Sequence, residues 1–232
     1  SVAANRVQYP LTIDKKVAGP MKLEDNRREY RYGKLTRATL ADSPHLQFRY
    51  WMEEAVAAGI NDPTAMTVSS INAAGEPWSR IVLLKSFDEG GLGFYTSLDS
   101  RKARDIESHP RVVLHFPWLQ MDRQVIVGGR AKMLPAETSA AYFATRPRES
   151  QIAAWVATQS EEIASRQVLD DEFARIQREF SGTDVPMPER WGGYTVIPDI
   201  WEFWQGGQYR LHDRFEYRKQ KKDSWNIRRL AP

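Results

Sequence analysis

The chain contains no cysteine among its 232 residues. This absence excludes disulfide bonds, thiolate catalysis and cysteine-ligated metals. The four histidines show no paired spacing typical of metal ligands, so we predict no metal site. The sequence also lacks the Gly-x-Ser-x-Gly segment of many hydrolases and the Gly-rich strand-to-helix turn that binds dinucleotides. Hydrolase and nicotinamide chemistry therefore have no support in the sequence.

Long apolar runs and stretches of one charge sign are missing as well. The longest apolar run, at 152–156, is far shorter than a membrane span, and the first residues do not have the pattern of a signal peptide. We therefore expect a cytoplasmic protein that binds no membrane. The net charge is only +3, and basic residues are mixed with acidic ones along the chain. This mixing argues against nucleic acid as a partner.

The residues that are present suit a single domain with a sizeable core, because 41% are hydrophobic and eight are tryptophan. We expect residues 1–25 to form a flexible tail and residues 26–232 one domain. Many short strands with tight turns predict a mainly β protein with peripheral helices, of the α+β class, built on a closed antiparallel barrel. Periodicity and turn signals predict helices over 44–58, 100–108, 135–145, 148–158 and 161–180, and strands over 64–71, 78–86, 92–96, 112–116, 124–133, 193–197, 200–204, 210–218 and 224–229.

The segment 204–214 is the most informative part of the chain. It places Trp204, two arginines and His212 next to a Gly-Gly pair. If 210–214 is extended, Arg210, His212 and Arg214 share one face. Two cations and an imidazole on one surface suit an anionic, planar ligand, since an unpaired buried charge is costly. The spacing alone also fits an exposed basic strand face.

Residues 202–207 (Glu-Phe-Trp-Gln-Gly-Gly) and 210–214 (Arg-Leu-His-Asp-Arg) resemble the C-terminal signature of the pyridoxine/pyridoxamine 5'-phosphate oxidase family. Motifs similar to this family continue in order over about 24–232. The resemblance implies an FMN-binding split β-barrel with peripheral helices that forms a homodimer. It also implies that pyridoxamine 5'-phosphate and pyridoxine 5'-phosphate are oxidised to pyridoxal 5'-phosphate, with dioxygen as acceptor and hydrogen peroxide as product.

Two segments carry cations that suit phosphates. Arg80 and Lys85 are five apart on an expected strand, so they point to opposite faces and can reach two anions, or simply solvent. Arg101 and Lys102 follow the N-cap candidate Ser100, so these cations would lie at the positive end of the helix dipole. Either an anion binds there and compensates the charges, or the protein tolerates the small unfavourable energy. The resemblance assigns FMN to Arg80, Ile81, Val82, Leu83, Leu84, Lys85, Tyr95, Thr96, Arg101, Lys102, Gln124, Gln159, Ser160, Trp204 and Arg214, with Gln159 and Ser160 supplied by the partner subunit.

Tyr142, Arg146 and Ser150 are each four residues apart, which places them on one face of a continuous helix. Pro147 turns the chain between them, and an ordinary basic helix end is the alternative. The resemblance implies that this group is the substrate-phosphate site. It also implies that residues 27–30 form a lid, whereas the residues alone indicate only a solvated run of charges. It implies Arg210 and His212 as the catalytic pair. The substrate residues are Arg27, Arg28, Glu29, Tyr30, Lys85, Tyr142, Arg146, Ser150, Arg210, Leu211 and His212.

Two functions of other classes remain as alternatives. A non-catalytic flavin-binding or haem-handling relative should lack the second phosphate group and the Arg210–His212 pair, which are both present here. A basic RNA-binding barrel should expose aromatic side chains between cations. Tyr217, Trp225 and the pair at 228–229 give this alternative weak support.

Overall fold

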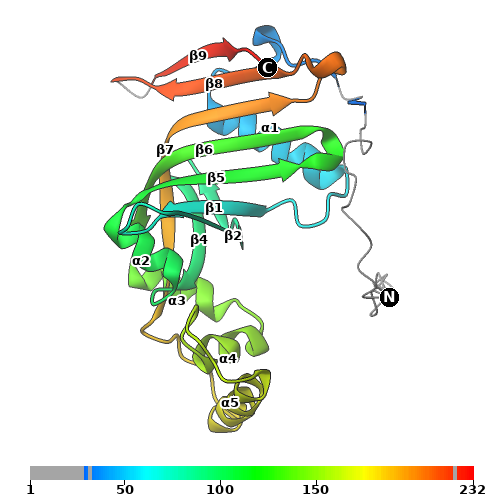
Figure 1. The fold of residues 1–232 in the computed structure, drawn as a ribbon. Coiled ribbons are helices and arrows are strands. Elements are labelled where there is room, and N and C mark those ends of the chain that lie inside the picture. Colours follow the sequence, from blue (N-terminus) through cyan, green and yellow to red (C-terminus); the bar gives the residue numbers. More distant parts are fainter. Residues whose placement is uncertain (1–28, 31–32, 222–223) are drawn as a thin grey trace, which may run out of the picture.

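The structure, a computed structural model, describes residues 29–30, 33–221 and 224–232. The expected tail at 1–25 and the predicted substrate residues Arg27 and Arg28 lie outside these described residues. Within them, a curled antiparallel sheet carries helices at one end and across one face (Figure 1).

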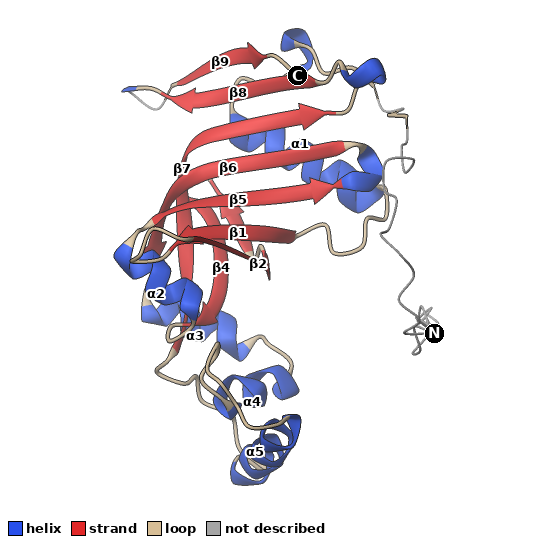
Figure 2. Cartoon of the chain, in the orientation of Figure 1, coloured by secondary structure: helices blue, strands red, loops and turns tan. Residues whose placement is uncertain are grey.

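Nine strands form the sheet in the order β2-β1-β5-β6-β7-β4-β3, and β8 and β9 extend it from β7. Every pair is antiparallel, and the strands curve into a half-barrel (Figure 2). No strand pair joins β2 to β3 in the described part of the chain, so the expected closed barrel is wrong and the sheet is open along one side. The strands are β1 (Ala65–Ile71), β2 (Pro77–Leu83), β3 (Ser86–Asp88), β4 (Gly91–Ser97), β5 (Arg111–Trp118), β6 (Arg123–Met133), β7 (Trp191–Gln205), β8 (Asp213–Lys219) and β9 (Trp225–Leu230).

β7 is the longest strand and joins the two parts of the sheet. Its first half pairs with β4, its second half pairs with β8, and β6 follows it along most of its length. The sequence predicts two strands here, separated at Pro198. The structure instead keeps one strand, because a bulge at Gly128/Gly129 of β6 absorbs the irregularity. Gly129 is needed at this point, since a Cβ would lie 2.4 Å from the carbonyl oxygen of Ile197.

The helices cover one face of the sheet and build a separate lobe. Phe48 of α1 is fully buried against Phe116 and Trp201 of the sheet. A second apolar cluster, which includes Phe143, Ile152 and Trp191, lies beneath α3, α4 and α5. No described helix has the length and apolar character needed to cross a bilayer. The helices are α1 (Pro44–Ala57), α2 (Arg101–Ser108), α3 (Ala136–Ala144), α4 (Arg148–Val156) and α5 (Arg166–Glu179), with short 3-10 turns at Arg37–Thr39, Leu119–Met121 and Gln208–Arg210.

Candidate functional site

One cavity of about 810 Å³ collects most of the residues that the sequence assigns to cofactor and substrate. It lies between β2, β4, the N-terminus of α2 and the α3–α4 region. Small-molecule sites usually have volumes of roughly 300–1,000 Å³. Segments distant in sequence thus converge on one site. The predicted residues in its lining are Arg80, Ile81, Val82, Leu83, Lys85, Tyr95, Thr96, Arg101, Lys102, Tyr142, Arg146, Gln159 and Ser160.

The segment 80–85 does not behave as one strand. β2 ends at Leu83, Leu84 is buried in the core, and Lys85 lies in the connection to β3. Because the chain leaves the strand, side-chain alternation does not continue to Lys85. Arg80 and Lys85 both line the same cavity, so the prediction that they reach ligands on opposite sides is wrong.

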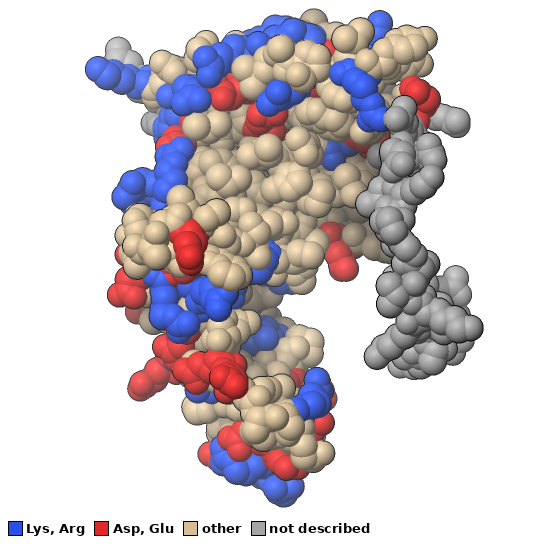
Figure 3. All heavy atoms as spheres, viewed as in Figure 1, with Lys and Arg blue, Asp and Glu red and all other residues tan. Residues whose placement is uncertain are grey.

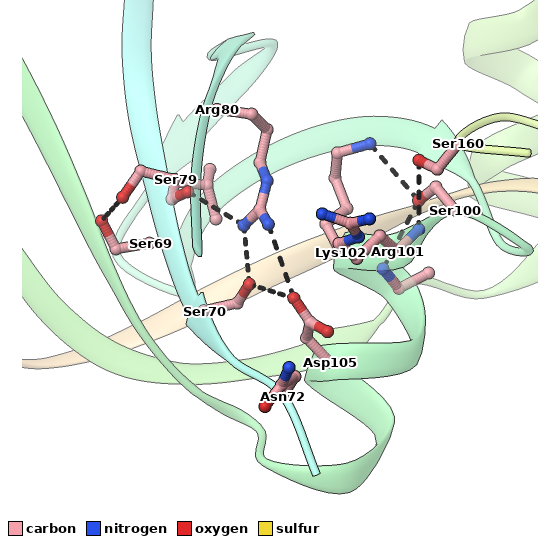
Figure 4. Close-up of polar contacts among 12 residues, drawn as sticks. Ser69, Ser70, Asn72, Ser79, Arg80, Ser100, Arg101, Lys102, Asp105 and Ser160 are labelled. Carbon is pink, nitrogen blue, oxygen red and sulfur yellow. Dashed lines mark hydrogen bonds and ion pairs between the residues drawn. The ribbon is translucent and has the colours of Figure 1, made fainter. Parts of the chain in front are cut away.

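Arg80 is held by residues behind the cavity wall. Its Nη1 donates to the hydroxyl of Ser70 at 2.6 Å and to the carbonyl of Val68 at 3.1 Å. Its Nη2 lies 3.4 Å from Oδ2 of Asp105, a buried carboxylate of α2. Figure 4 shows the guanidinium pointing toward Ser70 and Asp105. These contacts fix a cation at the cavity wall.

Lys102 is a buried cation with uncharged partners. Its Nζ donates to Thr96 Oγ1 at 2.9 Å, Ser100 Oγ at 3.3 Å and Gln159 Oε1 at 2.7 Å. Burial, and secondarily the charge of Arg80, lower the pKa of Lys102 to about 8. A buried ammonium without a directly bonded carboxylate is costly. An anion in the cavity would compensate this charge.

The N-terminus of α2 has the geometry expected from the sequence. The Ser100 side chain accepts a hydrogen bond from the backbone N–H of Ala103, which confirms it as the N-cap. Arg101 is exposed, its backbone N–H donates to Ser160 Oγ at 3.3 Å, and its guanidinium lies 4.3 Å from the ring centre of Trp78. The first turn therefore combines two cations with the positive end of the helix dipole, which favours a bound phosphate.

Gln159 and Ser160 belong to the cavity of their own chain. Gln159 Oε1 accepts hydrogen bonds from Lys102 and from Thr96, and Ser160 contacts the start of α2. The expectation that the partner subunit supplies this pair is therefore wrong for this structure. The loop after α4 folds back onto α2, a contact over about sixty residues of chain that local sequence patterns do not reveal.

The other end of the cavity is aromatic and carries a further cation, Arg146. Tyr142 stacks on Tyr95 with ring centres 4.1 Å apart, and Arg146 lies 4.9 Å from the ring centre of Trp191. Arg146 Nη1 is buried and has no hydrogen-bond partner among the described residues. Burial lowers the pKa of this guanidinium. Ser150, in the first turn of α4 after the expected corner, is not part of the lining.

A second group of predicted residues lies around the turn after β7. Tyr30 packs edge-to-face on Trp204 and on His212, with ring centres 5.7 and 5.2 Å apart. Arg210 Nη1 donates to the Tyr30 hydroxyl at 3.3 Å. Glu29, next to Tyr30, is exposed. Tyr30, in the described part of the resembled lid segment, thus lies beside the predicted catalytic pair.

The expected extended face at 210–214 does not form. Tyr209 and Arg210 have positive φ values of 55° and 64°, which bend the chain into a 3-10 turn. β8 begins only at Asp213, so Arg210, His212 and Arg214 do not share one strand face. Leu211 is 68% exposed. Left-handed backbone at non-glycine residues is costly and often marks functional turns.

The Gly-Gly pair allows this close packing. A Cβ on Gly206 would lie 2.6 Å from the Tyr30 ring, and one on Gly207 would lie 2.1 Å from a backbone oxygen. The backbone N–H of Gly207 donates to His212 Nδ1 at 3.1 Å. Burial and the charge of Arg210 lower the pKa of His212. Because Nδ1 accepts the hydrogen bond from Gly207, the neutral form of the ring carries its proton on Nε2.

Gln124, Trp204 and Arg214 lie side by side on β6, β7 and β8. His115 Nε2 is 3.1 Å from Gln124 Oε1, which fixes the amide. Arg214 is bound by both carboxylate oxygens of Glu202, at 2.9 and 3.2 Å. None of these residues, nor those of the Tyr30 group, is in the lining of the large cavity. One chain therefore carries the predicted site residues as two separate groups.

Sequence reasoning missed several residues that support the cavity. Asp105 and Ser70 hold Arg80, and Trp78 and Trp191 contact Arg101 and Arg146. The sequence offered a signal for Asp105 only, as an acidic residue that follows several basic ones in the short helix predicted over 100–108. The other contacts depend on strand pairing and loop packing.

Comparison with known proteins identifies the family. Residues 52–179 match the family model for pyridoxamine 5'-phosphate oxidase, and residues 191–232 match the model for the pyridoxine 5'-phosphate oxidase C-terminal dimerisation region. The pyridoxine/pyridoxamine 5'-phosphate oxidase of Pseudoalteromonas translucida (strain TAC 125) is 50% identical over 212 residues, which is 91% of this chain and 100% of that protein. The protein of the same name from Aliivibrio fischeri (strain MJ11) is 48% identical over the same shares.

Solved structures show the same fold. The PhzG structure from Burkholderia lata 383, in complex with tetrahydrophenazine-1-carboxylic acid, has a TM-score of 0.81 and 25% identity, over 87% of this chain and 99% of that one. A pyridoxamine 5'-phosphate oxidase-related, FMN-binding protein from Nostoc punctiforme has a TM-score of 0.67 at 14% identity, over 83% and 100%, and this likeness shows the fold alone. The half-barrel is thus a split β-barrel, and the chain belongs to the pyridoxine/pyridoxamine 5'-phosphate oxidase family.

Proposed function

We propose that this enzyme uses FMN to oxidise pyridoxamine 5'-phosphate and pyridoxine 5'-phosphate to pyridoxal 5'-phosphate, with dioxygen as acceptor and hydrogen peroxide as product. The observation that carries the proposal is the distribution of cations in the cavity. Arg80, Arg101 and Lys102 gather at one part of the lining, and Arg146 lies with stacked aromatic rings at another. Two phosphates joined to planar rings fit this arrangement.

The residues fit a flavin phosphate on grounds of charge. Among the described residues no carboxylate is bonded to the ammonium group of Lys102, and Arg101 opposes the helix dipole. A phosphate dianion would neutralise both and accept hydrogen bonds from the start of α2. When bound, the flavin would take a hydride from C4' of the substrate and pass its electrons to dioxygen.

Arg146 and Lys85 would hold the phosphate of the substrate. The partnerless Nη1 of Arg146 can donate to it, and stacking on Trp191 fixes the plane of the guanidinium. His212 would offer its Nε2–H to the substrate while Gly207 holds Nδ1. Arg210 would add a cation beside it. Orientation at the reacting distance is the main contribution of these groups.

We infer that the complete site is shared by two chains of a homodimer. The Tyr30–His212 group and the residues Gln124, Trp204 and Arg214 lie apart from the cavity that they would serve. Figure 3 shows a broad area without charged side chains over β1, β5 and β6, on the face turned away from α1. On β2, Ile81 is 74% exposed. An uncharged surface that exposes apolar side chains such as Ile81 is typical of interfaces, and the matched C-terminal dimerisation region supports the same arrangement.

The RNA-binding alternative loses its support. Tyr217 is fully buried and its hydroxyl donates to the carbonyl of Ala41 at 2.6 Å, while Arg228 is paired with Glu216 at 2.7 Å. Tyr217 is thus inaccessible to a base, and Trp225, the other aromatic residue of this alternative, is partly buried against the core.

Complementation between two inactive variants tests the proposed function and the shared site together. The wild-type dimer should convert pyridoxamine 5'-phosphate to pyridoxal 5'-phosphate, and Lys102→Met and His212→Ala should each lose at least about tenfold in kcat/KM. Co-expression of both variants should restore about a quarter of the wild-type activity, because in a two-fold dimer half the dimers are mixed and each has one intact site. Mixed dimers without recovered activity would place the whole site in one chain.

A further inference from the structure

Asp105 is a buried carboxylate outside the cavity, and the proposed function gives it no role. Its side chain is 4% exposed on α2. Oδ2 accepts a 2.6 Å hydrogen bond from the Ser70 hydroxyl and lies 3.4 Å from Arg80 Nη2. Ser70 in turn accepts from Arg80 Nη1 at 2.6 Å, so the three side chains form a closed triangle (Figure 4). Burial of a carboxylate is tolerated when such partners satisfy it.

The hydrogen bonds of Arg80 show which N–H donors of its guanidinium remain available for a ligand. A guanidinium has five N–H donors in a fixed plane. Both N–H groups of Nη1 are used, by Val68 and Ser70, and one of Nη2 is used by Asp105. The remaining two, on Nε and Nη2, lie on one edge and have no partner among the described residues. This is an edge that binds phosphate with two parallel hydrogen bonds.

We propose that Asp105, acting with Ser70, is a positioning residue that holds one edge of Arg80 so that the other edge is presented to the flavin phosphate in the cavity. The inference rests on the proposed function, since it takes the anion to be the phosphate of FMN. It assigns Asp105 no contact with the ligand.

A positioning role and a simple charge role of Asp105 predict opposite changes in FMN affinity when this residue is neutralised. A carboxylate near a phosphate repels it, so charge alone predicts tighter FMN binding when Asp105 is neutralised. Positioning predicts weaker binding, because a released guanidinium must be ordered again when the ligand binds. Asp105→Asn keeps the shape of the side chain and separates the two effects.

Asp105 also acts on the ammonium beside Arg80. The charged groups that act on Lys102 are Arg80 on β2 and Asp105 on its own helix, and its hydrogen-bond partners among the described residues are uncharged. The charge of Asp105 raises the pKa of Lys102, while burial and Arg80 lower it. Neutralising Asp105 therefore lowers the pKa of Lys102 further. FMN affinity should then begin to fall at a lower pH than in the wild type.

The experiment is titration of the full-length apoprotein with FMN, followed by quenching of flavin fluorescence, from pH 6 to pH 10. Asp105→Asn should weaken FMN binding about tenfold at pH 7, and its affinity should begin to fall at a lower pH than that of the wild type. Ser70→Ala should weaken FMN binding about threefold without changing the pH at which affinity begins to fall. Glu107→Gln, an equal charge change at an exposed position of α2, should alter affinity by less than about twofold.

The same substitutions in an Arg80→Ala background decide whether Asp105 acts through Arg80. At pH 7, well below the alkaline range in which Lys102 loses its proton, we expect Asp105→Asn and Ser70→Ala to have almost no effect there, as in a double-mutant cycle of coupled residues. Unchanged or tighter FMN binding by Asp105→Asn, or equal losses in both backgrounds, would overturn the inference. If Asp105→Asn does not fold, Ser70→Ala in the two backgrounds gives the same decision. A wild-type protein that does not bind FMN, or Arg80→Ala with wild-type affinity, would instead refute the proposed phosphate site.

Discussion

Replacement of Lys102 by methionine should weaken FMN binding about 10- to 100-fold at pH 7. A hydrogen bond to a charged group contributes roughly 1.5–3 kcal/mol, and the proposed site places the phosphate beside this buried ammonium group. Methionine keeps the length of the side chain and removes its charge. Isothermal titration of apoprotein with FMN measures the loss. Lys132→Met, the same change at an exposed position of β6, should leave the affinity unaltered.

The effect should depend on pH in a defined direction. The pKa of Lys102 is lowered to about 8 in the ligand-free protein, and a bound phosphate raises it again. FMN affinity should therefore fall as the pH rises above about 8, and Lys102→Arg should remove this fall because a guanidinium stays charged. The free energy of unfolding should change in the opposite direction and rise with pH. The unfolded chain binds more protons between pH 8 and 10.5, so burial of Lys102 becomes less costly as the pH rises through that window. Flat FMN affinity from pH 7 to 10 in the wild type would contradict this account.

Replacement of Arg146 by alanine should raise the KM for pyridoxine 5'-phosphate about 10- to 100-fold and leave FMN bound. The reason is again loss of a charge-assisted bond, of roughly 1.5–3 kcal/mol, to the substrate phosphate. Lys85→Ala should act in the same direction. Arg178→Ala, at an exposed position on α5, is the control for the charge change.

Pyridoxine, which lacks the phosphate, is the control substrate for the Arg146→Ala prediction. Arg146→Ala should alter any turnover of pyridoxine by less than about threefold, because the lost bond involves only the phosphate. If Arg146→Ala loses FMN with unaltered KM, the two phosphate sites have been assigned in reverse.

The sequence was sufficient for the parts of the site that depend on local structure. Ser100 caps α2 as expected, Arg101 and Lys102 occupy its first turn, and Pro147 separates α3 from α4. Most of the cavity lining consists of residues that family resemblance assigned to cofactor or substrate, and their ligand roles stay predictions.

Features that depend on tertiary structure were not predictable from local patterns. The left-handed turn at Tyr209 and Arg210 uses residues that seldom adopt that conformation, so an extended strand was the reasonable expectation. The end of β2 at Leu83 is set by pairing with Ala65 of β1, which the apolar run 81–84 does not show. The contact of Gln159 with Lys102 requires a loop to return across the cavity. These three differences concern where the chain leaves or rejoins a regular element.

Anaerobic reduction of the bound cofactor by substrate tests the central claim most directly. The account predicts that the purified protein, loaded with FMN, has a yellow visible band that disappears when pyridoxamine 5'-phosphate is added without oxygen and returns when air is admitted, with one pyridoxal 5'-phosphate formed per flavin. A protein that stays colourless after incubation with FMN, or a visible band that substrate leaves unchanged, would contradict it.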